Sequence, residues 1–176
     1  MGNLSSLFPS QRPLGVLCED ALILLRNVNA LRIRQLPNYA VTKFLMKRVV
    51  AALIWKDGSV LACQRTRHQV MPLKWEFPGG KIEEGEQARD ALHRELDEEL
   101  GIQAVIGHEV RRLVHTYPSG SAVELRFYEV HEYGGELENR IFRDVRWLKP
   151  AELPSYDFLE ADLELVRDLA DGKLAG

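Results

Sequence analysis

Apolar side chains along residues 46–176 recur in short runs that predict a β-sheet. Residues 49–55 are almost continuously apolar, as in a buried strand, and Lys56-Asp57-Gly58 predicts a turn into a return strand at residues 59–64. Residues 65–76, which include Pro72, are expected to form a loop. Further strands are expected at residues 105–117, 122–133 and 145–148.

Two stretches have helical rather than strand spacing. Ala88, Ala91, Leu92 and Leu96 share one face of a helix expected over about residues 87–100, which Gly101 ends. A second helix is expected at residues 158–169, with a buried stripe of Leu159, Leu163, Val166 and Leu169. A mixed sheet with one helix on each side is an α/β/α sandwich, so the fold class is α/β with a mixed α+β sheet.

Residues 1–45 differ from the remainder of the chain. Ala21, Leu22, Leu25 and Val28 recur at helical spacing and predict one amphipathic helix, which Pro37 limits. We therefore expect residues 1–45 to be an extension of unknown role and residues 46–176 to be the main domain. The extension carries no visible chemistry, and an apolar stripe alone does not distinguish packing on its own domain from dimerisation.

Composition narrows the class of partner. The chain has 176 residues and a formal net charge of −3, so it has no basic surplus to attract a nucleic-acid backbone. Cys18 and Cys63 form no CxxC motif, and no apolar run reaches membrane-spanning length. We therefore expect a cytoplasmic monomer or homodimer that acts on a small molecule, with no nucleic acid and no membrane as partner.

The most informative cluster of charges lies on the first predicted helix. Glu95, Glu98 and Glu99 stand at i, i+3 and i+4, so three carboxylates share one helical face behind a glycine-rich entry. Like charges so placed repel one another, and a bound divalent cation would reverse the sign of that interaction. The alternative is a solvated acidic helix with no site.

Residues 80–102 resemble the Nudix box, G-x5-E-x7-R-E-U-x-E-E-x-G-U, where U is apolar. All nine specified positions match: Gly80, Glu86, Arg94, Glu95, Leu96, Glu98, Glu99, Gly101 and Ile102. The resemblance runs from Met46 to the C-terminus and is closest to the MutT-like branch. It implies a hydrolase that uses Mg²⁺ or Mn²⁺ and converts a nucleoside triphosphate to the monophosphate and pyrophosphate.

The resemblance also implies which residues bind the metal. Gly79 resembles the backbone-carbonyl ligand just before the box, and Glu98 and Glu99 resemble the principal carboxylate ligands. Glu95 resembles either a ligand or the base that activates water. MutT-like chains commonly carry another glutamate six residues before the last strand's tryptophan, where this chain has Ile141. Glu136 or Glu138 could substitute if the loop is shifted, so the identity of the base and of one outer metal ligand stays open.

Cations near the box have separate expected roles. Arg94, grouped with Glu95 and Glu98 as a catalytic residue, resembles the arginine that orients a box glutamate, with Glu86 as its partner. Lys81 and Arg65 resemble phosphate-contacting cations, although Arg65 is equally compatible with a surface position.

Two residues resemble those that bind the base. Phe77 is expected to line an apolar slot, or else to belong to the core, and Asp162 matches a position where relatives acting on CTP have aspartate. An ionised aspartate only accepts hydrogen bonds, so it favours a base edge rich in N–H donors, unless Asp162 is simply an exposed helix residue.

The expected substrates are therefore (d)CTP or an oxidised purine nucleotide such as 8-oxo-dGTP, which implies nucleotide-pool sanitation and hence DNA repair. Hydrolysis of ADP-ribose, or of another nucleoside diphosphate linked to a second group, is the alternative reaction. Pro118 lies where ADP-ribose hydrolases have a proline but discriminates poorly. A Nudix domain that has lost catalysis and serves as a ligand sensor or scaffold is the non-enzymatic alternative.

Overall fold

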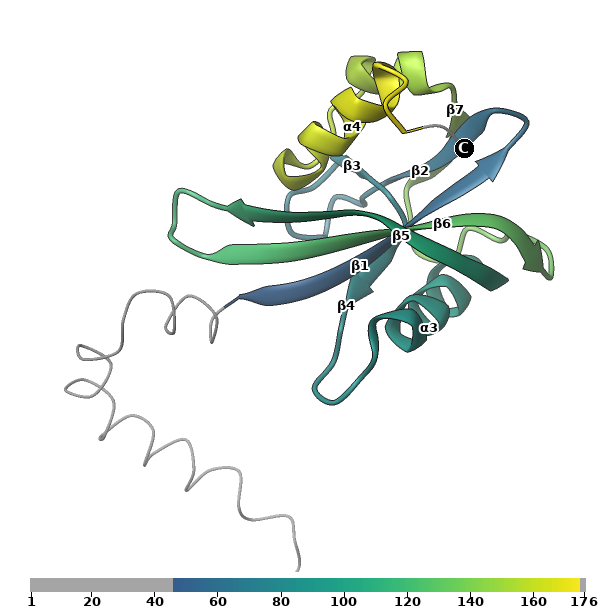
Figure 1. Ribbon diagram of the computed structural model, residues 1–176, viewed down its shortest axis with the longest axis horizontal. Helices are drawn as coiled ribbons and strands as arrows, with labels where there is room; N and C mark the ends of the chain where they lie inside the picture. Colours follow the sequence, from purple (N-terminus) through teal and green to yellow (C-terminus); the bar gives the residue numbers. More distant parts are fainter. Residues whose placement is uncertain (1–45, 175–176) are drawn as a thin grey trace, which may run out of the picture. The chain divides into compact units, whose positions relative to one another are not determined.

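The computed structural model describes residues 46–174, which contain seven strands and two α-helices (Figure 1). The expected N-terminal helix lies outside the described residues. The strands are β1 (Lys47–Lys56), β2 (Ser59–Gln64), β3 (Trp75–Glu76), β4 (Gly79–Lys81), β5 (Gln103–Thr116), β6 (Ala122–Gly134) and β7 (Asp144–Leu148). The helices are α3 (Ala88–Leu100) and α4 (Leu163–Ala170), with 3₁₀ turns η2 (Pro150–Ser155) and η3 (Glu160–Asp162) before α4.

Strand β1 is the centre of the sheet. Its first eight residues run parallel to β6, and residues 49–51 pair antiparallel with β4 on the other edge. Its last two residues pair with β2, which in turn pairs with β3 and β7. Strands β5 and β6 form a long antiparallel hairpin. The sheet is therefore mixed, as the sequence predicts.

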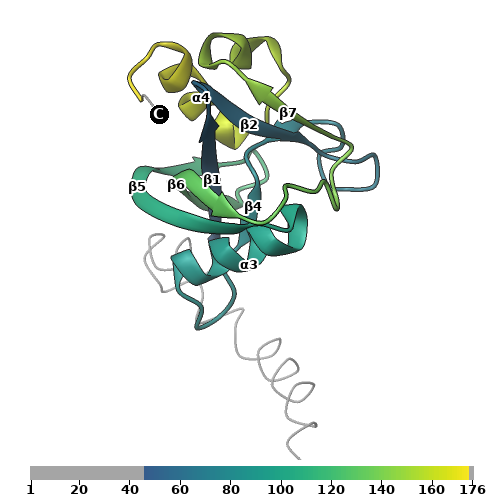
Figure 2. The ribbon, with the colours of Figure 1, turned by 90° about the vertical axis from the view of Figure 1, so that its right-hand side faces the viewer.

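The two helices cover opposite sides of the sheet (Figures 1 and 2). On one side, α3 contributes Ala88, Ala91, Leu92 and Leu96 to an apolar cluster with the central strands, as expected from their spacing. On the other side, α4 packs over a second apolar cluster that contains Phe127. The α/β/α sandwich is thus confirmed.

The second helix is shorter than its apolar spacing predicts. Residues 157–159 are extended instead, because Trp75 in β3 exchanges backbone hydrogen bonds with Asp157 and Leu159. The helix therefore begins at Leu163, which is exposed rather than part of the buried stripe. Pairing with β3 outweighs the local helical pattern and places Asp162 just ahead of α4.

The predicted loop at residues 65–76 also ends in structure, since Trp75 and Glu76 form β3 against β2. Among the described residues, no helix is long and apolar enough to cross a membrane.

Candidate active site

Strand β4 brings the glycine-rich entry against the acidic helix. A Cβ atom built on Gly80 would lie 2.4 Å from the carboxyl carbon of Glu95. One built on Gly79, whose φ is +144°, would lie 2.2 Å from the carbonyl oxygen of Val50. Glycine at both positions therefore lets β4 lie between β1 and the carboxylates of α3 without a clash.

Glu99 is the buried carboxylate of the box. Its side chain is 8% exposed, and its Oε2 accepts a hydrogen bond of 2.9 Å from the Gly79 amide. Burial raises the pKa of Glu99 to about 9; the Gly79 hydrogen bond opposes this rise, whereas Glu76 and Glu95 add to it. In this environment a proton or a cation is needed to balance the Glu99 charge.

Arg94 connects the loop before α3 to the carboxylates on the helix. Its guanidinium donates to both oxygens of Glu86 at 3.0 and 3.1 Å, to Glu95 Oε1 at 2.8 Å and to the Lys81 carbonyl at 3.1 Å. These hydrogen bonds raise the pKa of Arg94 and lower that of Glu86. The expected Arg94–Glu86 ion pair is present, so Arg94 holds protein groups in this structure rather than facing the cavity.

The carboxylates do not converge on one point. Glu98 is 60% exposed and lies 3.6 Å from Arg94, which also contacts Glu95. Within residues 46–174, no three His, Cys, Asp or Glu side chains are gathered in a metal-holding arrangement. The donor chemistry nevertheless fits Mg²⁺ or Mn²⁺, since all candidate ligands offer oxygen and the buried Glu99 has no ion-pair partner among residues 46–174, although Arg65 lies near enough to lower its pKa slightly. The metal-binding roles of Gly79, Glu95, Glu98 and Glu99 remain predictions.

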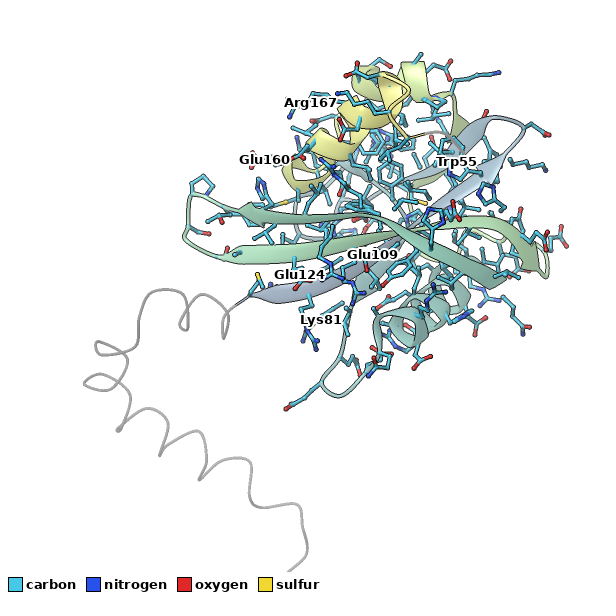
Figure 3. The ribbon with its side chains drawn as sticks, in the orientation of Figure 1. Trp55, Lys81, Glu109, Glu124, Glu160 and Arg167 are labelled. Carbon is cyan, nitrogen blue, oxygen red and sulfur yellow. The ribbon has the colours of Figure 1, made fainter. Side chains whose placement is uncertain are left out.

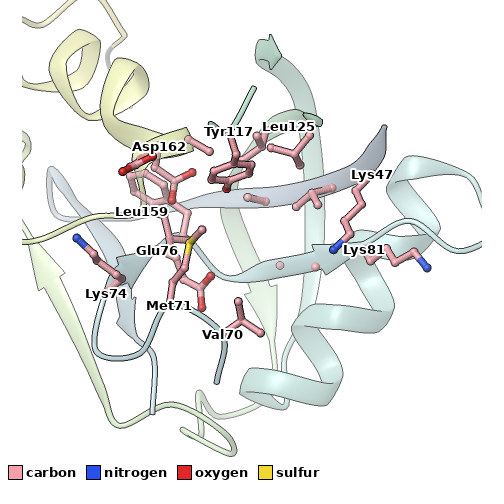
Figure 4. Close-up of a pocket in the computed structure, with 18 of the residues that line it drawn as sticks. Lys47, Val70, Met71, Lys74, Glu76, Lys81, Tyr117, Leu125, Leu159 and Asp162 are labelled. Carbon is pink, nitrogen blue, oxygen red and sulfur yellow. The ribbon is translucent and has the colours of Figure 1, made fainter. Parts of the chain in front are cut away.

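A cavity of about 770 Å³ begins at the glycine entry (Figure 4). Gly79, Gly80 and Lys81 line it near the acidic helix, and Leu159 and Asp162 line it at the other end. It therefore joins the neighbourhood of the carboxylates to the expected base-binding residues.

Phe77 both lines this cavity and belongs to the core. Its ring is 3% exposed and packs edge-on against Phe127 and at a tilt against Phe158, with centroids 6.2 and 5.4 Å apart. Phe77 therefore lines the cavity and belongs to the core at the same time, so the two placements expected for it do not exclude each other.

Asp162 is 3% exposed, so the interpretation of an exposed helix residue is wrong. Burial raises the pKa of its carboxyl well above the usual value; Glu76 adds to this rise, and Arg65 opposes it. Burial therefore disfavours the ionised form expected for Asp162, and its role in base binding stays a prediction. A neutral carboxyl both donates and accepts a hydrogen bond.

Arg65 is already engaged by protein groups. Its Nε donates to Glu76 Oε1 over 2.9 Å, its Nη1 donates to the Val70 carbonyl, and its side chain is only 23% exposed. It is not a free surface arginine, although it does line the cavity. Its phosphate role stays a prediction, and phosphate would compete with Glu76.

Glu76 was missed as a site residue by sequence reasoning. It lines the cavity beside Arg65, and burial raises its pKa even though the arginine opposes the shift. The available signal was a charged residue between two aromatic residues, Trp75 and Phe77, next to a glycine pair. An acid in that position needs a buried partner, and Arg65 is that partner.

The loop before β7 does not supply an obvious replacement for the late glutamate. Ile141 is exposed, and Glu138 pairs with Arg140 at 3.3 Å. Arg140 in turn donates to the Asp97 carbonyl near the end of α3. Neither Glu136 nor Glu138 lines the large cavity.

Comparison with known proteins agrees with this geometry. The family model described as the NUDIX domain matches the sequence of residues 45–169. A CTP pyrophosphohydrolase of Escherichia coli K12 is 38% identical over 121 residues, which cover 69% of this chain and 89% of that protein. A putative 8-oxo-dGTP diphosphatase 2 of Mycobacterium tuberculosis is 39% identical over 122 residues, with 69% and 86% covered.

Solved structures give the same assignment. The Escherichia coli ORF135 protein superposes with a TM-score of 0.65 at 36% identity, covering 73% of this chain and 91% of that one. A MutT structure described for Aliivibrio salmonicida and Vibrio cholerae gives 0.62 at 29% identity, with 72% and 98% covered. The chain therefore belongs to the NUDIX family and is a Nudix hydrolase.

Proposed function

We propose that this protein hydrolyses nucleoside triphosphates to the monophosphate and pyrophosphate in a metal-dependent reaction. The observation that carries the proposal is the cavity, which runs from the buried Asp162 to the glycines that contact Glu95 and Glu99. A nucleotide has the same polarity, with a base at one end and phosphates at the other. The relatives whose names specify CTP and 8-oxo-dGTP support the same class of substrate.

The metal would be held by Glu95, Glu98, Glu99 and the Gly79 carbonyl. Bound Mg²⁺ or Mn²⁺ supplies phosphate neutralisation and an acidified water. The chain's own contribution is positional: Gly79 fixes the buried Glu99, and Arg94 fixes Glu95. Glu95 would act either as a metal ligand or as the base that activates water, as the sequence leaves open. Of the three glutamates, it is the one that lies against Gly80 at the edge of the cavity.

Asp162 and Phe77 would bind the base. A neutral carboxyl offers one O–H and one carbonyl oxygen, which match the N3 acceptor and the N4 amino donor of cytosine. An ionised carboxylate would instead suit the N1 and N2 donors of a guanine or 8-oxoguanine. Because burial raises the pKa of Asp162 and disfavours its ionised form, (d)CTP is the first substrate to test, with 8-oxo-dGTP second.

The role that follows is removal of unwanted nucleotides from the cytoplasmic pool. The test is a panel of (d)CTP, 8-oxo-dGTP, dGTP and ADP-ribose with magnesium, with manganese and with EDTA, in which each phosphate product is identified. Pyrophosphate from (d)CTP or 8-oxo-dGTP, lost on chelation, supports the proposal. Turnover of ADP-ribose alone would replace it with the alternative reaction, to which Pro118, a residue of the cavity wall, was tied in the sequence.

Glu98→Gln tests the metal role with little risk to folding, because this side chain is 60% exposed. Turnover should fall by orders of magnitude while the melting temperature stays near that of the wild type. Glu84→Gln, in the exposed loop before α3, is the matched control and should keep full activity. Absence of turnover on every nucleotide, with intact folding, would favour the sensor or scaffold alternative.

A further inference from the structure

Lys47 lies on the same face of β1 as two small cavity-lining residues. Side chains alternate along a strand, so Lys47, Val49 and Ala51 project to one side, and all three line the large cavity. Val49 is paired directly with Lys81 of β4, and Ala51 with Gly79. Lys47 is thus the outermost residue of a row that begins beside the glycine entry.

The cavity has four basic side chains along its walls, and two of them are occupied. Arg65 pairs with Glu76, and Lys74 pairs with Asp157. Within residues 46–174, the amino groups of Lys47 and Lys81 have no hydrogen-bond or ion-pair partner. An uncompensated ammonium group at a cavity wall is suited to an anionic ligand.

The two free lysines point differently. Figure 4 shows Lys47 reaching from β1 toward the strand that carries the glycines, whereas the Lys81 side chain extends away from the middle of the cavity. Asp162 and Leu159 lie at the opposite end. A ligand with its base at Asp162 and its phosphates at the glycine entry would therefore extend its last phosphates toward Lys47.

We propose that Lys47 binds the terminal phosphates of the substrate and so selects triphosphates over diphosphates. This inference rests on the proposed function, because it places the base end of the nucleotide at Asp162. The spacing agrees: Lys47 lies four residues along β1 from Ala51, the partner of Gly79, which is about 13 Å of strand. The lysine arm shortens that separation, which suits the second and third phosphates better than the first.

The charge also has a chemical purpose. Hydrolysis of the bond between the first and second phosphates consumes one water and releases pyrophosphate, on which negative charge accumulates as the bond breaks. An ammonium group already placed at the outer phosphates stabilises that leaving group. A diphosphate lacks the outermost phosphate, so the ammonium group attracts it less strongly.

The kinetic test compares a nucleoside triphosphate with its matching diphosphate. Lys47→Met removes the charge and keeps the apolar arm, so KM for the triphosphate should rise about 10-fold or more while KM for the diphosphate changes little. Lys47→Arg should restore most of the preference. Lys56→Met, at the other end of β1, is the matched control and should leave both constants unchanged. An unchanged ratio of the two KM values in Lys47→Met would overturn the inference.

A binding measurement separates this inference from the proposed function. Inorganic tripolyphosphate with magnesium is titrated into the full chain by calorimetry, with pyrophosphate as the shorter probe. The wild type should bind tripolyphosphate about 10-fold more tightly than Lys47→Met does, with a smaller difference for pyrophosphate. Such a difference without any nucleotide turnover would keep the phosphate site and refute the proposed function. Equal binding by the two proteins would refute the site, whatever the turnover.

Discussion

The amide of Gly79 donates a hydrogen bond of 2.9 Å to Glu99 Oε2, which joins the glycine entry to the buried carboxylate of the acidic helix. One hydrogen bond offsets only part of the cost of burying this charge, since the pKa of Glu99 is still about 9. The ligand-free site is therefore arranged at the expense of stability, as is common where a protein binds an ion.

Glu99→Gln should stabilise the metal-free protein. The pKa of Glu99 lies above the ordinary value of 4.5, so the folded state retains a proton that the unfolded chain loses, and stability should fall as pH rises from about 4.5 to about 9. The amide removes that dependence and should add roughly 0.5–2 kcal/mol at pH 7 while abolishing turnover. Urea denaturation with EDTA at pH 5, 7 and 9 measures the effect. Equal pH dependence in the variant and the wild type would contradict the burial argument.

Gly80→Ala should impair activity more than stability. The added Cβ would meet the Glu95 carboxyl group at 2.4–2.5 Å, and that group is the movable end of a side chain. Glu95 should shift by a fraction of an ångström or more, lowering turnover by about 10²-fold, with a small change in melting temperature. Gly134→Ala is the control, because its Cβ would meet nothing within 4 Å. Full activity in Gly80→Ala would show that the position of Glu95 is unimportant.

Asp162→Asn should preserve turnover of cytosine nucleotides to within about 10-fold, because an amide donates and accepts as a neutral carboxyl does. The wild type should lose its preference for cytosine as pH rises through the elevated pKa of Asp162, and the variant should not. Profiles of kcat/KM for dCTP against pH, in both proteins, measure this. A large loss on dCTP in the variant at neutral pH would indicate that the carboxyl acts in its ionised form.

Glu109→Gln should weaken the fold without affecting catalysis. Glu109 lies on the β5–β6 hairpin (Figure 3). It accepts hydrogen bonds from Arg112, Arg126 and Tyr128, and these hydrogen bonds hold its pKa at about 2. This stabilisation is present above pH 4.5 and is lost as pH falls toward 2.

The amide variant should be up to about 1 kcal/mol less stable at pH 7 and should show a shallower acid transition. Thermal melts from pH 2 to 7 measure both effects. Glu132→Gln, an exposed residue of β6, is the control. A variant with the acid transition of the wild type would exclude Glu109 as its source.

Much of the fold was accessible from local patterns. The glycine entry, the α3 face and the β1–β2 hairpin are encoded by short-range spacing, and the structure has them at the expected places. The start of α4 was not accessible, because it depends on Trp75 pairing with residues some eighty positions later. The helical pattern at Phe158 and Leu159 was real but weaker than that pairing.

The site divides in the same way. The spacing of Glu95, Glu98 and Glu99 is a local property of the helix and is visible in the sequence. The burial of Asp162, which raises the pKa of its carboxyl, and the pairing of Arg65 with Glu76 depend on contacts between distant segments, which no short segment reveals. The sequence therefore predicts the placement of the acidic residues along α3 better than the burial of Asp162 and Arg65.

Strand β1 pairs with β2, β4 and β6, whereas residues 157–159 join the sheet through backbone hydrogen bonds with Trp75 in β3. The two ends of the cavity are consequently attached to different strands of the sheet. The glycine entry lies on β4, which pairs with the central strand β1, whereas Asp162, for which base binding is proposed, follows a stretch joined to the short strand β3. Under the proposed function, substitutions within residues 157–162 should alter the preferred base while the acidic helix α3 keeps its place against the glycine entry.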